Sequence, residues 1–119
     1  MKKTLVIGAS ENPERYSFKA VNRLKERSHP VLAIGAREGK IGDTKILNGS
    51  PAFKDIDTIT LYLNPGRQKE LYTYMLNLNP KRIIFNPGAE NPELEKLARS
   101  KGIEVVEACT LVMLSTGEF

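Results

Sequence analysis

Short apolar runs alternate along the chain with longer segments in which apolar residues recur every three or four positions. The runs are apolar at nearly every position, which is typical of strands buried on both faces in a parallel sheet covered by helices. Most of them end at a glycine or at an Asn-Pro-Gly turn. The pattern predicts five strands, at residues 5–7, 31–34, 58–63, 83–85 and 105–106.

The helical segments between these runs carry recognisable start signals. Ser17 can cap the first helix, Asn64 followed by Pro65 the second, and Asn91 followed by Pro92 the third. Strands that alternate with helices predict right-handed βαβ units. We therefore expect an α/β fold, a Rossmann-like three-layer α/β/α domain with a mostly parallel five-stranded sheet.

Residues 36–57 interrupt this alternation with several glycines and a proline. A loop of this length is uncommon in a small domain unless it is functional or conceals a short element. We expect a short edge strand around residues 45–47. With 119 residues and no linker or repeat, the chain is predicted to form one domain over 1–119.

Composition excludes several classes of site. His29 is the only histidine and Cys109 the only cysteine, so neither a structural zinc site nor an internal disulfide is expected. The net charge of +4 favours anionic ligands, but the cations are dispersed, so no nucleic-acid partner is expected. No apolar run is long enough for a membrane span or a signal peptide, which predicts a cytoplasmic protein without membrane contacts.

Ligands of open parallel sheets bind beyond the carboxyl ends of the strands, where the strand order reverses. Four segments lie at such ends, and all are rich in small or turn-forming residues. They are residues 8–18, 35–40, 64–67 and 86–91. Small residues let a ligand approach the backbone, and the amides at a helix start attract phosphate.

The first segment fails the dinucleotide fingerprint, because Ser10 and Pro13 stand where the second and third glycines would follow Gly8. At the end of the second strand an NAD site uses an acidic residue, whereas this chain has Arg37 after Gly35 and Ala36. A cation there suits a phosphate on the ribose, as in NADP or coenzyme A. The sequence therefore disfavours plain NAD.

Several ordered motifs resemble those of the small coenzyme A-binding proteins related to the N-terminal domain of the succinyl-CoA synthetase α subunit. The motifs are VIGAS at 6–10, NPERYSF at 12–18, IG at 41–42, DID at 55–57, NP at 64–65, GAEN at 88–91 and EACTLV at 107–112. The resemblance implies a domain that binds coenzyme A or an acyl-coenzyme A. It also implies that the pyrophosphate lies near Gly8, Ala9, Ser10, Ser17 and Phe18.

Three segments depart from that family's usual pattern. Asn-Pro-Lys after the second strand is replaced by residues 35–37, where Arg37 keeps the charge. Arg-Pro after the strand at 58–63 is replaced by Asn64-Pro65, and Gln-x-Gly after the next strand by Asn86-Pro-Gly88. Asn64, Pro65, Asn86 and Gly88 are candidate cofactor contacts, but helix capping and a sharp turn also explain them.

Three functions are compatible with these residues. The first is a coenzyme A-binding protein that does not catalyse alone, since His29 stands at the amino end of a strand and no paired carboxylates or metal ligands appear. The others are an NADP-type binder or small reductase, and a scaffold with a vestigial pocket. The expected partners are a small-molecule nucleotide cofactor and either a second copy or a partner enzyme subunit. Cys109, just after the last strand, is either a buried apolar residue or faces the cleft.

Overall fold

Seven strands form one sheet in the order β3-β4-β2-β1-β5-β6-β7 in the computed structural model, which describes residues 1–119. Every neighbouring pair is parallel except the antiparallel pair of β3 and β4. The strands are β1 Thr4–Ile7, β2 Val31–Ile34, β3 Gly39–Ile41, β4 Thr44–Leu47, β5 Thr58–Leu61, β6 Arg82–Phe85 and β7 Glu104–Glu107.

The expectation of five strands is wrong, because a hairpin of β3 and β4 occupies much of the segment predicted as a loop. A two-residue Gly42-Asp43 turn joins the strands, and Gly42 takes a φ of +60°. Such turns need a left-handed residue, which glycine supplies at low cost. The short strand expected near 45–47 is β4, but it lies inside the sheet, and β3 forms the edge.

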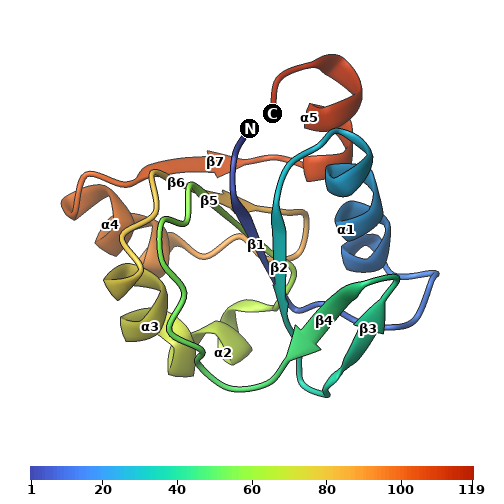
Figure 1. The fold of residues 1–119 in the computed structure, drawn as a ribbon. Helices are drawn as coiled ribbons and strands as arrows, with labels where there is room; N and C mark the ends of the chain where they lie inside the picture. Colours follow the sequence, from blue (N-terminus) through green and yellow to red (C-terminus); the bar gives the residue numbers. More distant parts are fainter.

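Helices cover both faces of the sheet, as Figure 1 shows: α1 and α5 lie on one side, and α2, α3 and α4 on the other. The helices are α1 Tyr16–Glu26, α2 Pro65–Gln68, α3 Tyr72–Asn77, α4 Pro92–Ser100 and α5 Thr110–Thr116, with a 3₁₀ turn η1 at Lys69–Leu71. The three-layer arrangement agrees with the expectation. The second predicted helix is broken into α2, η1 and α3, and α5 has no counterpart among the predicted elements.

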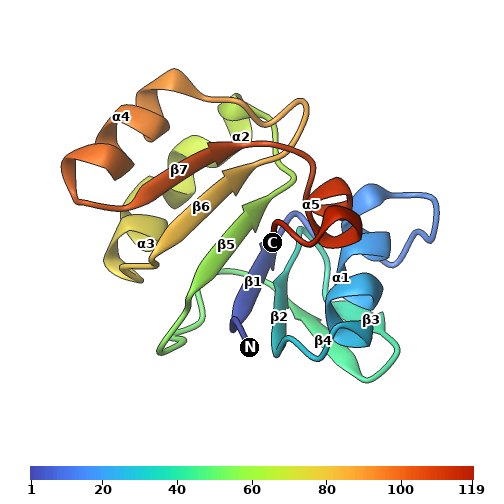
Figure 2. The same ribbon diagram turned by 90° about the horizontal axis from the view of Figure 1, so that it is seen from above.

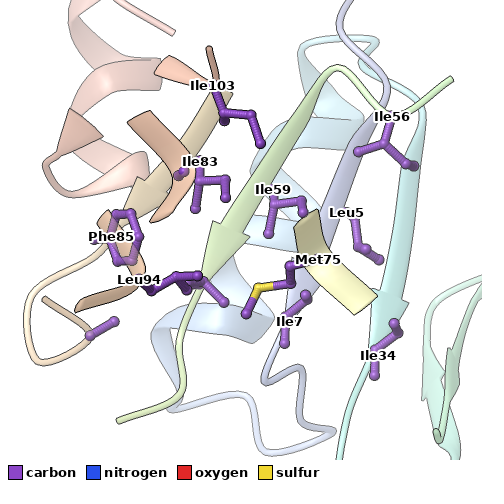
Figure 3. Packing of buried hydrophobic residues seen from close by; sticks show 13 residues of the cluster. Leu5, Ile7, Ile34, Ile56, Ile59, Met75, Ile83, Phe85, Leu94 and Ile103 are labelled. Carbon is purple, nitrogen blue, oxygen red and sulfur yellow. The ribbon is translucent and has the colours of Figure 1, made fainter. Parts of the chain in front are cut away.

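Residues 5–7 of the central strand β1 are all apolar because this strand contributes to two cores. In β1, Leu5 and Ile7 pack with Met75 and Leu94 from the face of α3 and α4 (Figure 3). Val6 points the other way, into a second cluster with α1 and α5. Successive strand residues face opposite sides, so a strand between two helical layers has no polar face.

The direction of winding reverses at β1. From β1 the chain winds through α1 to β2 on one side, and after β4 it returns to β5 on the other side of β1 (Figure 2). The carboxyl ends of β1 and β5 therefore meet at the switch point of a doubly wound sheet, where ligands of such folds bind. No helix is long and apolar enough to cross a membrane.

Candidate functional site

Two glycines allow the ends of β1, β2 and β5 to approach each other closely. A Cβ on Gly8, whose φ is +95°, would lie 3.0 Å from the carbonyl carbon of Tyr62. A Cβ on Gly35 would lie 2.3 Å from the carbonyl oxygen of Ala9. The amides of Gly8 and Ala9 both donate to the Ile34 carbonyl at 2.9 Å. These residues shape the loop, and the N–H groups of Gly8 and Ala9 are already occupied.

Free backbone donors lie at the start of α1. The amides of Tyr16, Ser17 and Phe18, in its first turn, have no hydrogen-bond partner. The N-cap residue, Arg15, makes no side-chain capping bond, and the first turn holds no acidic residue. Orphan amides at the positive end of a helix dipole form an arrangement that suits an anion.

The prediction that Ser17 caps α1 is wrong, because the helix begins at Tyr16 with Arg15 as its N-cap. A local turn brings the start forward: the Asn12 side chain accepts from the Glu14 amide at 3.0 Å, and its carbonyl accepts from the Arg15 amide. Ser17 is buried on the inner face of the helix. Its backbone amide has no partner in the protein and is available to a ligand at this point.

A cavity of about 450 Å³ lies on the opposite side of β1 from α1. The carboxyl ends of β1, β2 and β4, residues 48–50, α2 and η1 surround it. Gly8 lines the cavity and is the only predicted site residue that does so. The volume is in the range of small-molecule sites. The apolar lining comes from Ile7, Ile34, Leu63 and Leu71, and the polar side chains are Asn48, Ser50, Arg67 and Glu70.

Arg37 is exposed and does not line the cavity, although its neighbours Gly35 and Ala36 do. The loop that carries it is held in place from two sides. The Glu11 carboxylate accepts from the Lys40 amide at 2.9 Å, and the Asn48 side chain donates to the Ala36 carbonyl at 3.0 Å. The structure thus leaves Arg37 outside the cavity lining, while residues 48–50, which the sequence does not suggest, form part of the wall.

Helix capping fully explains why Asn64 and Pro65 stand at the start of α2. The Asn64 side chain accepts from the Arg67 amide at 3.0 Å, and Pro65 takes the first helical position of α2. This is the expected cap, since proline has no N–H to satisfy there. The pair sets the direction in which α2, and with it Arg67, leaves the end of β5.

Asn86 is buried and its side chain is committed to the protein. Its amide nitrogen donates to the Thr60 hydroxyl at 2.7 Å and to the Leu61 carbonyl at 2.9 Å, and its oxygen accepts from the Thr110 amide at 2.8 Å. Asn86 therefore joins β5, β6 and the start of α5. Gly88, with a φ of +92°, is exposed and donates its amide to Glu90 at 2.9 Å. Neither Asn86 nor Gly88 reaches the cavity.

Gln68 is fully buried, although no sequence signal singles it out. Its side-chain nitrogen donates to the carbonyls of Leu63 and Ala89, both at 2.8 Å, and its oxygen accepts from Asn91 at 2.8 Å. Gln68 thus fixes α2 against the loop after β6. The sequence conceals this role because Gln68 stands within a short polar run that looks exposed.

Two carboxyl groups at this edge interact unfavourably when both are charged. The pKa of Glu107 is raised because its carboxyl hydrogen-bonds the neighbouring Glu95, whose charge also opposes ionisation. Glu95 is buried and accepts from the Asn91 amide at 3.0 Å. This acidic end of β7 is the least suitable part of the edge for a phosphate.

Cys109 is the N-cap residue of α5 and is partly exposed. Nearby Tyr62 lies just after β5, and burial raises its pKa to about 12. The Thr60 and Thr110 hydroxyls lie beside it, but they bond each other at 2.8 Å, and the Tyr62 hydroxyl is buried without a well-formed hydrogen bond. A neutral tyrosine and a half-buried thiol make this side of the switch point largely apolar.

His29 lies at the amino edge of the sheet, away from the switch point. Its Nδ1 accepts from the Lys2 amide at 3.0 Å, and its pKa is lowered by burial and by nearby positive charges. A larger concavity of about 680 Å³ opens beside it, between the amino ends of β2 and β4. It lies at the edge opposite to the one where ligands of doubly wound sheets bind.

The comparisons with known proteins concern the family and the fold. The CoA binding domain family matches residues 2–115. The crystal structure of an uncharacterized protein is 48% identical, with a TM-score of 0.98, and the match covers 100% of this chain and 98% of the other. A Thermus thermophilus protein is 23% identical, with a TM-score of 0.84 and coverage of 99% and 91%.

A hypothetical protein from Pyrococcus horikoshii is 21% identical, with a TM-score of 0.87 and coverage of 97% of this chain and 82% of the other. Likeness at this level of identity establishes a shared fold. No curated protein matches the chain. Since the family match spans nearly all of the chain, the protein belongs to the CoA binding domain family.

Proposed function

We propose that the protein binds coenzyme A or an acyl-coenzyme A at the carboxyl end of β1 and does not catalyse a reaction alone. One observation carries this proposal: the loop that leaves Gly8, at a 450 Å³ cavity, leads into a helix whose first-turn amides have no partner. A phosphate-bearing nucleotide needs both an anion site and a partly apolar cavity.

In this proposal the first turn of α1 and the cavity bind different parts of the cofactor. The pyrophosphate accepts from the amides of Ser17 and Phe18. The nucleoside enters the cavity between β2, β4 and α2, and Arg37 lies outside the cavity lining. The loop after β1 borders the pyrophosphate with Gly8, Ala9 and Ser10. The other candidate residues act indirectly, because they hold α2 and the neighbouring loops in place; they are Asn64, Pro65, Asn86 and Gly88.

Titration calorimetry with coenzyme A, acetyl-coenzyme A, NADP, NAD and ATP tests the proposal. We expect saturable binding of the two coenzyme A forms. Stabilisation by mass action is about 2.7 kcal/mol at a hundredfold excess over Kd, which a thermal melt detects. NADP binding at least about tenfold tighter, or about 1.4 kcal/mol, would favour the nucleotide-binding alternative instead.

A matched pair of variants locates the anion site. Ser10→Glu places a negative charge beside the proposed pyrophosphate and is expected to weaken binding about tenfold or more by repulsion. Ser115→Glu makes the same change on the exposed face of α5 and is expected to leave binding unchanged. Absence of any coenzyme A binding by the unmodified protein would contradict the proposal.

A further inference from the structure

We propose that helix α2 and the turn after it read the nucleoside end of the cofactor, with Arg67 binding the ribose phosphate and Glu70 accepting from the base amino group. This inference rests on the proposed function, because it assigns specificity to two residues of the same cavity. The ribose phosphate would then contact Arg67 on the α2 side of the cavity, and not Arg37 in the loop after β2.

Arg67 is the only lysine or arginine that lines the cavity. Its backbone amide is fixed by the Asn64 cap at 3.0 Å, so the origin of the side chain is well defined. Its guanidinium is exposed and has no ion pair or hydrogen bond to the protein. A guanidinium in this state can bind a phosphate with two parallel hydrogen bonds.

Arg37 is less well placed for the same task. It is exposed between β2 and β3, outside the cavity lining, and Glu38 follows it directly. The Glu11 carboxylate is bonded to the same loop through the Lys40 amide. The two carboxylates balance the charges of Arg37 and Lys40 in this loop, so its net attraction for a phosphate is small.

Glu70 lines the cavity three residues after Arg67, on the same face of the helical segment. The two side chains form no ion pair within 4.0 Å. A carboxylate in a phosphate site opposes binding unless the ligand brings it a hydrogen-bond donor. The amino group of adenine is such a donor, and Ile34, Leu63 and Leu71 offer apolar contact to the flat base.

Calorimetry with coenzyme A and 3′-dephospho-coenzyme A tests the role of Arg67. We expect the unmodified protein to prefer coenzyme A on the order of tenfold, as for loss of a charge-assisted contact. Arg67→Gln should abolish this preference, and the matched control Arg37→Gln should retain it. A preference that survives in Arg67→Gln, or is lost in Arg37→Gln, would overturn the assignment.

The affinities of the unmodified protein for the two ligands distinguish the phosphate contact from coenzyme A binding as such. Equal affinity of the unmodified protein for the two ligands would overturn only the phosphate contact. Failure to bind either ligand would overturn the proposed function and this inference together. Thermal unfolding is the folding control, and neither substitution should alter it because both arginine side chains are exposed.

The deaminated, hypoxanthine form of coenzyme A tests Glu70 in the same way. The unmodified protein should bind the adenine form more tightly, and Glu70→Gln should remove that difference. If Glu70→Gln instead tightens binding of both forms equally, Glu70 only repels the phosphates, and its role in reading the base is refuted.

Discussion

The two halves of the carboxyl edge use similar residues for different purposes. Around β5 and β6, the buried side chains of Gln68, Asn86 and Asn91 are all hydrogen-bonded within the protein. Around β1 and the cavity beside it, the first-turn amides of α1 and the exposed Arg67 side chain of α2 have no protein partner. The buried amide side chains of the first half are satisfied within the protein, and its Tyr62 hydroxyl is unpaired but buried. The second half has unpaired donors that include an exposed side chain at a cavity.

This difference teaches how to separate a ligand site from structural turns in this fold. Asn, Pro and Gly follow strands in both halves, so loop composition does not distinguish them. Buried polar groups must be paired, and once paired they offer nothing to a ligand. The half whose unpaired donors include an exposed side chain at the cavity is therefore the candidate site, and the following substitutions test that distinction.

The largest effect is expected from Asn86→Ala. It leaves the Thr110 amide and the Leu61 carbonyl without this partner inside the protein, and it removes a link among three elements. We expect a loss of about 2–4 kcal/mol in the free energy of unfolding, measured with urea. Asn77→Ala, on the exposed end of α3, is the control and should change little. A loss below about 1 kcal/mol would show that the network is not closed as described.

Gly35→Ala tests the close approach on the other half. The new Cβ would lie 2.3 Å from the Ala9 carbonyl oxygen and 2.9 Å from Ile46, so the loop after β1 must move. We expect a destabilisation of about 1–3 kcal/mol and weaker coenzyme A binding. Gly66→Ala, in α2 with its nearest neighbour at 3.4 Å, should be neutral or stabilising. Equal effects of both substitutions would argue against a specific contact at Gly35.

Asn64→Ala removes the cap of α2 and leaves its proline in place. The expected cost is about 1 kcal/mol, measured by thermal unfolding, because the Arg67 amide loses its side-chain acceptor and keeps only the Asn64 carbonyl. Asn64→Ser keeps a neutral acceptor and should retain most of the stability. If coenzyme A binding falls in Asn64→Ser while stability does not, Asn64 contacts the ligand directly and the capping explanation is incomplete.

The smallest effect concerns Glu107, whose raised pKa reflects Glu95. The folded protein holds the Glu107 proton more tightly than the unfolded chain, so stability falls as the pH rises above the ordinary value of 4.5. Glu107→Gln should therefore raise Tm at pH 7, with the gain disappearing towards about pH 4. Glu104→Gln, at the other end of β7, is the control. A gain that does not depend on pH would exclude this electrostatic cause.

Much of the fold could be predicted because its signals are local. The strands at 5–7, 31–34 and 83–85 agree with β1, β2 and β6, and the caps at Asn64 and Asn91 are confirmed. Of the hairpin, only β4 was predicted from the sequence, because both strands are short and the turn between them has only two residues. The α5 helix escapes prediction because its start is stabilised by Asn86 and by no side chain of its own.

The candidate site was predictable to a smaller extent. The switch-point rule directs attention to Gly8, which lines the cavity. The rule names a strand end, however, and does not say which side chains of the following loop turn towards the ligand. That the remaining candidate residues contact a cofactor stays a prediction.

The sequence by itself determined the α/β alternation, the positions of most strand ends, and membership of a family of coenzyme A-binding domains. These depend on periodicity, capping and turn chemistry, in which the interacting residues lie within a few positions of each other. Which polar residues are already satisfied depends on contacts between distant parts of the chain. The partners of Asn86 lie 24, 25 and 26 residues away, and Gln68 reaches Ala89 21 residues along the chain, so no local pattern could reveal that they are occupied.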